Sequence, residues 1–305
     1  MTLQRFTFRA MAAENEVQVW GERAMAETAA RRAIAEIARI EAKYSRYKDD
    51  SVVSRINAAA GGKPVAIDDE TRSLLAYANA CWTQSGGLFD ATSGILRRAW
   101  NFDVARVPAA AELAPLIARV GWQHVEIDEQ GVRLAKEGMQ LDFGGFGKEY
   151  AVDRAALVLK ESGAASAMVN LAGDLAVVGP QPGGLAWRVG IRHPRREGLI
   201  ATLEIASGGI ATSGDYERFV EVDGVRHCHI LDPRTGRSAR GFQSVTVHGP
   251  GCLVAGSATT VAMLKNEREG LAWLDAMGLA YLCVTETGKV IQRFGDKIFG
   301  PSRTS

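Results

Sequence analysis

The residues best suited to chemistry lie between Thr212 and Gly236. This segment contains the runs Thr-Ser-Gly-Asp-Tyr-Glu-Arg and His-Ile-Leu-Asp-Pro-Arg-Thr-Gly, so hydroxyls, carboxylates, arginines and a histidine gather around turn signals. Such a density of reactive groups is rare in a segment that is needed only for folding. A histidine among them can act as a general base or contact a ligand. We therefore expect a ligand site here, with His229 as its candidate catalytic base.

A β-hairpin is predicted to position this histidine. Residues 219–222 and 225–230 favour extended structure, and the Asp-Gly pair between them is typical of a type I′ turn. The second run leads into a polar turn over residues 232–236. His229 should therefore lie near a strand end, beside a rigid loop.

Two other interpretations of this histidine stay open. His227 and His229 alternate along the predicted strand, a spacing that can place two zinc ligands on one face. No third ligand lies at a telling distance, so this interpretation is the weaker one. A structural histidine held by hydrogen bonds would also fit the position.

Two glycine-rich segments are further candidates for holding a ligand. Residues 144–148, Gly-Gly-Phe-Gly-Lys, open a predicted helix whose free N–H groups and partial positive charge suit a phosphate, and Lys148 adds a full charge. Gly86 and Gly87 would let residues 88–90 lie against a flat ligand. Simple turns, with a solvated lysine and a capping aspartate, would also account for both segments.

The composition excludes several classes of protein. The 305 residues carry a formal net charge of +1, with 23% charged and 47% hydrophobic residues, which disfavours a dedicated nucleic-acid binder and a disordered chain. No apolar run approaches a signal sequence or the ~20 residues of a membrane span. The scattered cysteines are Cys81, Cys228, Cys252 and Cys283. Because scattered thiols are typical of a reducing compartment, we expect a cytoplasmic protein without nucleic-acid or membrane partners.

Strands and helices mix along the chain without strict alternation, which favours the α+β class, with mixed or antiparallel sheets and packed helices. Hydrophobic periodicity predicts helices at residues 24–44, 51–60, 71–85, 149–161, 253–264 and 269–277. Extended segments are predicted at residues 5–9, 17–21, 167–171, 175–178, 187–192, 201–205, 244–247, 280–286 and 289–293, besides the hairpin.

Several motifs, taken in order, resemble those of the bacterial FAD:protein FMN transferases, the ApbE family. The matching runs are Met11 after the first strand; Ser45-Arg-Tyr near Ser51 and Asn57; Gly87-Leu-Phe-Asp-Ala-Thr; Leu141-Asp-Phe-Gly-Gly-Phe-Gly-Lys with Tyr150-Ala-Val-Asp; Asn170-Leu-Ala-Gly-Asp; Ala211-Thr-Ser-Gly-Asp-Tyr; and His229-Ile-Leu-Asp-Pro-Arg-Thr-Gly. The last two are quite specific, and the resemblance runs from about Phe6 to Leu282. It implies an ApbE-like architecture, related to the T-fold, as a single domain over residues 1–305, with room for two lobes that meet at the FAD site.

The resemblance also implies a magnesium-assisted phosphoryl transfer. Members of the family bind FAD, cleave its pyrophosphate, join FMN to a Ser or Thr hydroxyl of an acceptor flavoprotein, and release AMP. His229 would then be the base for the acceptor hydroxyl. The residues that would line the flavin and adenine sites are Met11, Tyr47, Leu88, Phe89, Asp90, Asp142, Lys148 and Ile230. The Gly145 carbonyl and the Thr260 side chain would contact the metal.

One departure from the family pattern concerns the metal. The usual magnesium motif is Ala-Asp-x-x-x-Thr, whereas residues 255–260 read Ala-Gly-Ser-Ala-Thr-Thr. Mg²⁺ is typically held by one or two carboxylates plus substrate phosphates, so glycine at position 256 predicts a weakened site. Gly256→Asp is then expected to increase magnesium-dependent turnover. Thr259 is a candidate auxiliary contact.

Two milder departures fall in ligand-facing loops. The usual Met-Gly-Thr is Met-Ala-Ala from Met11, and the second glycine of the usual Asn-x-Gly-Gly is Ala172. Two alternative functions stay open, and glycine at position 256 favours the first of them. The protein would be an FAD-binding flavin carrier with a degraded metal site, or an FAD pyrophosphatase in which water replaces the protein hydroxyl.

Overall fold

The centre of the molecule is an eight-stranded sheet in which every neighbouring pair is antiparallel. The computed structural model describes residues 2–293 and 299–300. The strand order is β1 (Thr2–Ala10), β2 (Ala13–Gly21), β5 (Ala167–Leu171), β6 (Asp174–Val178), β9 (Gly208–Gly214), β12 (Phe242–Gly249), β13 (Ala280–Thr285) and β14 (Val290–Arg293). The prediction of an α+β fold is confirmed.

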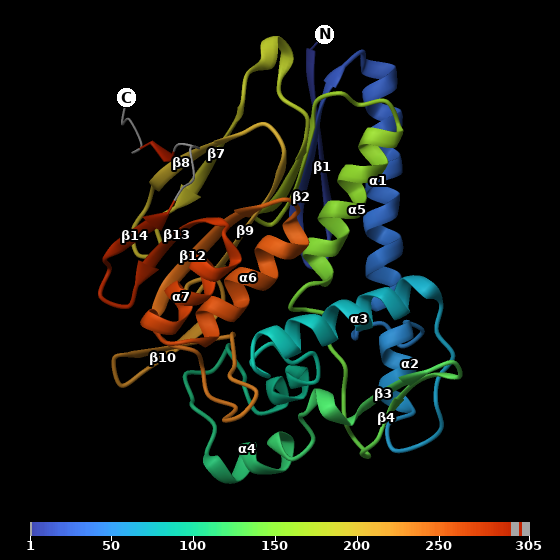
Figure 1. Cartoon of the computed structure of the whole chain (residues 1–305), viewed down its shortest axis with the longest axis vertical. Coiled ribbons are helices and arrows are strands. Elements are labelled where there is room, and N and C mark those ends of the chain that lie inside the picture. Colours follow the sequence, from blue (N-terminus) through green and yellow to red (C-terminus); the bar gives the residue numbers. More distant parts are fainter. Residues whose placement is uncertain (1, 294–298, 301–305) are drawn as a thin grey trace.

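Helices cover one face of this sheet (Figure 1). They are α1 (Arg23–Tyr44), α5 (Gly147–Glu161), α6 (Cys252–Leu264) and, against α6, α7 (Glu267–Met277). A stripe of buried alanines on α1, including Ala26 and Ala33, lets this helix pack closely along α5. This layer fixes the first turn of α5, which carries Lys148, above the middle of the sheet.

A second sheet covers the opposite face. It contains β7 (Trp187–Arg192), β8 (Leu199–Ile205) and β15 (Phe299–Gly300). Trp187 and Leu203 of this sheet pack with Ile210 of β9 and Leu282 of β13 in a second hydrophobic core. The central sheet is therefore buried on both faces around β9.

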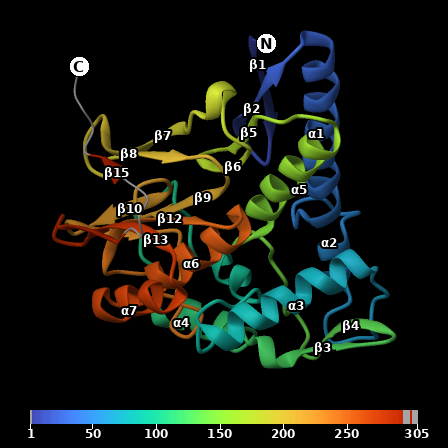
Figure 2. The same cartoon turned by 45° about the horizontal axis from the view of Figure 1, so that its top comes forward.

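The remaining elements lie together below the sheet (Figures 1 and 2). They are α2 (Val52–Ala58), α3 (Asp69–Gln84), the 3₁₀ segments η1 (Ser93–Arg98) and η2 (Trp122–His124), α4 (Ala110–Ile117) and the hairpin β3–β4 (Val125–Asp128, Gly131–Leu134). A third core joins them to the hairpin β10–β11 (Phe219–Val222, Val225–Cys228) through Trp100, Leu113 and Val220. No helix among the described residues is long and apolar enough to cross a membrane.

The predicted hairpin turn is confirmed, because Asp223 and Gly224 both have positive φ, at 53° and 72°. Its second strand ends at Cys228, two residues earlier than predicted. The sequence does not predict β9, which lies between β6 and β12 in the main sheet. Its sequence, Gly-Gly-Ile-Ala-Thr-Ser-Gly, resembles a turn because glycine disfavours strands locally, and only tertiary pairing makes it extended.

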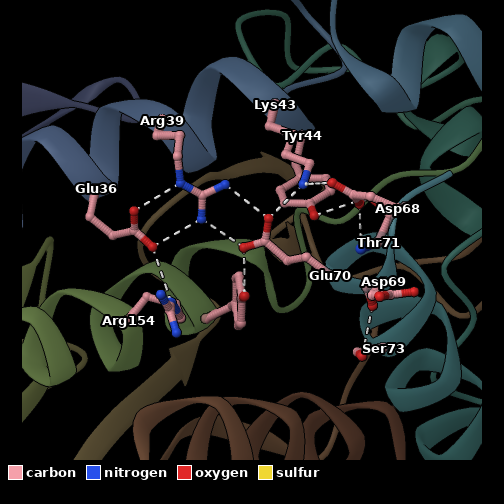
Figure 3. Close-up of polar contacts among 11 residues, drawn as sticks. Glu36, Arg39, Lys43, Tyr44, Asp68, Asp69, Glu70, Thr71, Ser73 and Arg154 are labelled. Atoms are coloured by element: carbon pink, nitrogen blue, oxygen red, sulfur yellow. Dashed lines mark hydrogen bonds and ion pairs between the residues drawn. The ribbon is translucent and has the colours of Figure 1, made fainter.

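A network of charged side chains ties α1 to α3 and α5 (Figure 3). Arg39 of α1 contacts Glu36 and Glu70 with paired hydrogen bonds of 2.7–2.9 Å. Glu70, at the start of α3, also accepts from Lys43 at 2.5 Å and from the Tyr150 hydroxyl of α5 at 2.8 Å. The hydrogen bonds from Arg39 hold the pKa of Glu70 well below its usual range despite partial burial.

We expect Glu70→Gln to lower the free energy of unfolding by about 1–2 kcal/mol at pH 7, because three donors lose a charged acceptor that is only partly exposed. The folded-state pKa of Glu70 lies below that of the unfolded chain, so this stabilisation is present above about pH 4.5 and is lost as the pH falls. Urea denaturation at several pH values measures both effects. Glu27→Gln, at an exposed pair with Arg23, is the matched control, and equal losses would contradict the prediction.

Candidate functional site

A cavity of about 380 Å³ opens where the central sheet meets the elements below it. Its walls come from the loop after α3, the start of α5, the β5–β6 turn, β7, β9, the segment after β11, and α6. The predicted site residues that line it are Leu88, Phe89, Asp90, Asp142, Gly145, Lys148, His229, Ile230 and Thr260. The fold therefore brings together predicted site residues that lie up to 172 positions apart in the sequence, from Leu88 to Thr260.

Met11 and Tyr47, two predicted flavin contacts, are not among the lining residues. Met11 lies in the β1–β2 turn, with a positive φ of 51°, and packs on the main core. Tyr47 is 75% exposed and receives a 3.2 Å hydrogen bond from Arg46. Arg46 in turn lies 3.5 Å from the carboxylate of Asp142. Tyr47 thus contacts Arg46, which in turn lies beside the cavity residue Asp142.

Asp90 has a structural task at the cavity wall. Its Oδ1 accepts hydrogen bonds from the backbone and hydroxyl of Thr92 at 2.7 and 2.6 Å, and its Oδ2 accepts from the backbone N–H of Trp122 at 2.9 Å. Both carboxylate oxygens are therefore engaged within the protein. This arrangement stiffens the loop that presents Leu88 and Phe89 to the cavity, as the capping interpretation of the sequence suggests.

The polar residues of segment 212–236 have two different roles. Thr212 and His229 line the cavity, whereas Asp215 pairs with Arg195 at 2.5–2.6 Å. Asp232 accepts from the backbone N–H of Arg234 at 2.8 Å and closes its own turn. The density of polar residues thus reflects a ligand-facing surface together with the ion pair and turn that support it.

His229 is held in a form that can accept a proton. Its Nδ1 lies 3.3 Å from the backbone carbonyl of Arg218, and because a carbonyl only accepts, Nδ1 is the protonated nitrogen. Nε2 then keeps its lone pair. Burial and the nearby charge of Arg97 lower the pKa of His229 to about 4, so the ring is neutral at pH 7. His227 packs instead against Trp100, with ring centroids 5.9 Å apart, so the two histidines do not form a zinc pair.

Lys148 projects from the first turn of α5 and forms an ion pair with Asp174 at the start of β6. Asp174 is buried, and its other oxygen accepts from the backbone N–H of Thr212 at 3.0 Å. Burial alone would lower the pKa of Lys148, but the carboxylates of Asp174 and Glu149 raise it above its usual value. The lysine therefore stays charged at the cavity wall, beside a helix start that no side chain caps.

Glu149 is the main lining residue that the sequence interpretation missed. It is 8% exposed, and its Oε2 has no hydrogen-bond partner in the described part of the chain. Burial and the neighbouring Asp174 raise the pKa of Glu149 above its usual value, although Lys148 opposes this shift. In sequence, a glutamate in a first helical turn is an ordinary, exposed residue, so no local signal marks it as buried.

The donor set of the cavity suits a hard cation. Gly145, Thr260 and Glu149 all line it and carry a backbone carbonyl, a hydroxyl and a carboxyl group, and oxygen donors are what Mg²⁺ prefers. Thr259 is not available, because its hydroxyl is buried and bonds to Ser213 and to the Gly256 carbonyl, both at 2.8 Å. Within the described ranges no group of three or more His, Cys, Asp or Glu side chains has metal-binding geometry, so phosphate oxygens of a ligand would have to complete the site.

Comparisons with known proteins agree with this architecture. The family model described as the ApbE family matches residues 11–283. The FAD:protein FMN transferase of Vibrio cholerae is 31% identical over 270 residues, spanning 85% of this chain and 80% of that protein. The corresponding protein of Treponema pallidum is 33% identical over 256 residues, spanning 74% and 71%.

Solved structures give the same assignment. The crystal structure of the ApbE protein of Thermotoga maritima superimposes with a TM-score of 0.89 at 32% identity, over 95% of this chain and 97% of that chain. The flavinyl transferase ApbE of Pseudomonas stutzeri gives a TM-score of 0.84 at 30% identity, over 96% and 94%. The matches in sequence and in structure extend over most of each chain, and this protein belongs to the ApbE family.

Proposed function

We propose that this protein is an FAD:protein FMN transferase, which transfers FMN from FAD to a Ser or Thr hydroxyl of an acceptor flavoprotein and releases AMP. The observation that carries the proposal is the neutral His229, which faces the same cavity as the cationic Lys148 and the oxygen donors of Gly145 and Thr260. A base, a cation and hard donors at one cavity are what in-line phosphoryl transfer requires.

In the proposed reaction, Nε2 of His229 takes the proton of the acceptor hydroxyl. The hydroxyl oxygen forms a bond to the phosphorus of the FMN phosphate as the pyrophosphate P–O bond breaks, and AMP leaves with that bonding pair. Lys148 and the uncapped N-terminus of α5 favour the negative charge of the phosphates. Leu88, Phe89 and Ile230 offer apolar surface to the flavin and exclude water.

The proposed activity uses Mg²⁺, which when bound would neutralise charge on the pyrophosphate. The Gly145 carbonyl and the Thr260 hydroxyl would contact it. Two further parts of the proposal concern the whole chain. They are a single domain over residues 1–305, whose two lobes meet at the FAD site, and a cytoplasmic location. Unpaired buried thiols at Cys228, Cys252 and Cys283 support that location.

Incubation with FAD, Mg²⁺ and a candidate acceptor flavoprotein tests the proposal. Covalent flavin fluorescence on the acceptor, with release of AMP, is the expected result. AMP together with free FMN would identify a pyrophosphatase, and tight FAD binding without AMP would identify a flavin carrier. Each of these outcomes would overturn the transferase proposal.

A further inference from the structure

Glu149 and Gly256 lie against each other where α5 contacts α6. A Cβ atom built on Gly256 would lie 2.6 Å from Cγ of Glu149, 3.1 Å from its Cδ and 3.2 Å from its Oε1. Real Cβ atoms essentially never come as close as 2.6 Å to another heavy atom, so the Glu149 side chain would have to move. The carboxyl group of Glu149 therefore fills the space that a side chain at position 256 would need.

Glu149 makes no ion pair with the described residues of the protein. Lys148 forms its ion pair with Asp174, whereas Glu149 is 8% exposed and its Oε2 has no partner among the described residues. A buried carboxylate without a partner is costly, unless another cation binds it. Because Lys148 is engaged by Asp174, an ionised Glu149 would have no ion pair within the described residues, and a divalent cation at the cavity would supply the missing counter-charge.

The other oxygen donors lie on α6 and just before the start of α5. Thr260 is four residues after Gly256, so both lie on the same face of α6. Gly145 lies two residues before the start of α5, and Glu149 lies in the first turn of that helix. Gly145, Glu149 and Thr260 all line the cavity, so three residues that carry oxygen donors meet there from α6 and from the start of α5.

We propose that Glu149 is the carboxylate ligand of the metal site, supplied from α5 in place of the carboxylate that α6 lacks at Gly256. The inference rests on the proposed function only in that a divalent cation binds together with FAD. Gly256 is then a requirement of the site, because any larger residue would displace the Glu149 carboxyl. The sequence alone predicts that Gly256→Asp increases turnover. Because the new side chain would overlap Glu149, we now expect the opposite result from this single substitution.

Mn²⁺ binding to the FAD-loaded protein tests this assignment without reference to turnover. The loss of the free Mn²⁺ signal in electron paramagnetic resonance measures the binding. We expect Glu149→Gln to weaken Mn²⁺ binding at least about tenfold, since loss of even an outer-shell partner costs about 10–100-fold in affinity. Without metal, the same variant should be no less stable than the wild type, because Oε2 of Glu149 makes no hydrogen bond that the substitution would remove. Glu161→Gln, at the exposed end of α5, is the matched control and should bind as the wild type does.

A relocation variant keeps the test decisive even if Glu149→Gln does not fold. Glu149→Gly combined with Gly256→Asp moves the carboxylate to α6 and should restore at least part of the Mn²⁺ affinity, whereas Gly256→Asp alone should not improve it. Equal Mn²⁺ affinity of wild type and Glu149→Gln, or tighter binding by Gly256→Asp alone, would overturn the role of Glu149 and leave the transferase proposal standing. No Mn²⁺ binding by the FAD-loaded wild type would overturn the metal dependence of the proposed function and this inference with it.

Discussion

Replacement of His229 by alanine is expected to lower the rate of flavin transfer by about 10²- to 10⁴-fold, the usual contribution of a general base. The structure supports this role because Nδ1 is committed to the Arg218 carbonyl, which leaves the Nε2 lone pair available at the cavity. Initial rates of AMP release with a saturating acceptor measure the effect, and FAD affinity should change little. His227→Ala is the matched control, two residues away and packed on Trp100. Equal losses in the two variants would contradict a catalytic role for His229.

The pH dependence of kcat/KM gives an independent check on the same residue. Because burial and Arg97 lower the pKa of His229 to about 4, the base is neutral over most of the accessible range. Activity should therefore be retained at pH 6 and fall only as the pH decreases towards 4, where the ring becomes protonated. An unperturbed histidine would lose activity near pH 6.5. Circular dichroism at each pH separates this effect from acid unfolding.

Lys148→Met is expected to lower the free energy of unfolding by about 2–3 kcal/mol at pH 8. The variant leaves Asp174 buried without its cation, and breaking a fully buried ion pair typically costs about 3–5 kcal/mol; the 30% exposure of the lysine side chain reduces this figure. Without the lysine, the pKa of Glu149 rises further above its unfolded value. A raised pKa gives stability at low pH that is lost as the pH rises, so the deficit should shrink towards pH 5.

Urea denaturation of the metal-free protein at pH 5 and pH 8 measures this deficit. Lys160→Met, in the exposed last turn of the same helix, is the control, with an expected change within about 0.5 kcal/mol. A deficit for Lys148→Met that is independent of pH would show that packing alone is affected. FAD affinity of the variant should also fall, because the cavity loses its cation nearest the start of α5.

Much of the fold could be predicted because local pattern and tertiary structure agree in most segments. The apolar spacing of α1 and the Asp-Gly turn at residue 223 each correspond to one structure, and both are confirmed. β9 is the exception, since three glycines in a seven-residue strand carry no strand signal, and its pairing partners lie far away in the sequence. The sequence also does not predict α4 or β3–β4, because elements of eight and four residues show little periodicity.

The candidate site shows a similar limit. Motif order indicated most of the residues that line the cavity, because a motif records which positions face a ligand. It could not distinguish Asp90, whose oxygens are used internally, from a ligand contact, or detect Glu149, whose burial depends on how α5 packs against α6. Burial and hydrogen-bond partners are properties of the folded molecule, and a single sequence does not contain them explicitly.

The contact between Glu149 and Gly256 has an evolutionary consequence. The side chains of positions 149 and 256 compete for the same space, so a chain can carry a glutamate at 149 or a side chain at 256. A single substitution at either position would leave the space overcrowded or without a carboxylate. We therefore expect the two positions to exchange together across the family. A classification that inspects only position 256 would find no carboxylate in chains of this kind, whereas inspection of both positions would find the one at position 149.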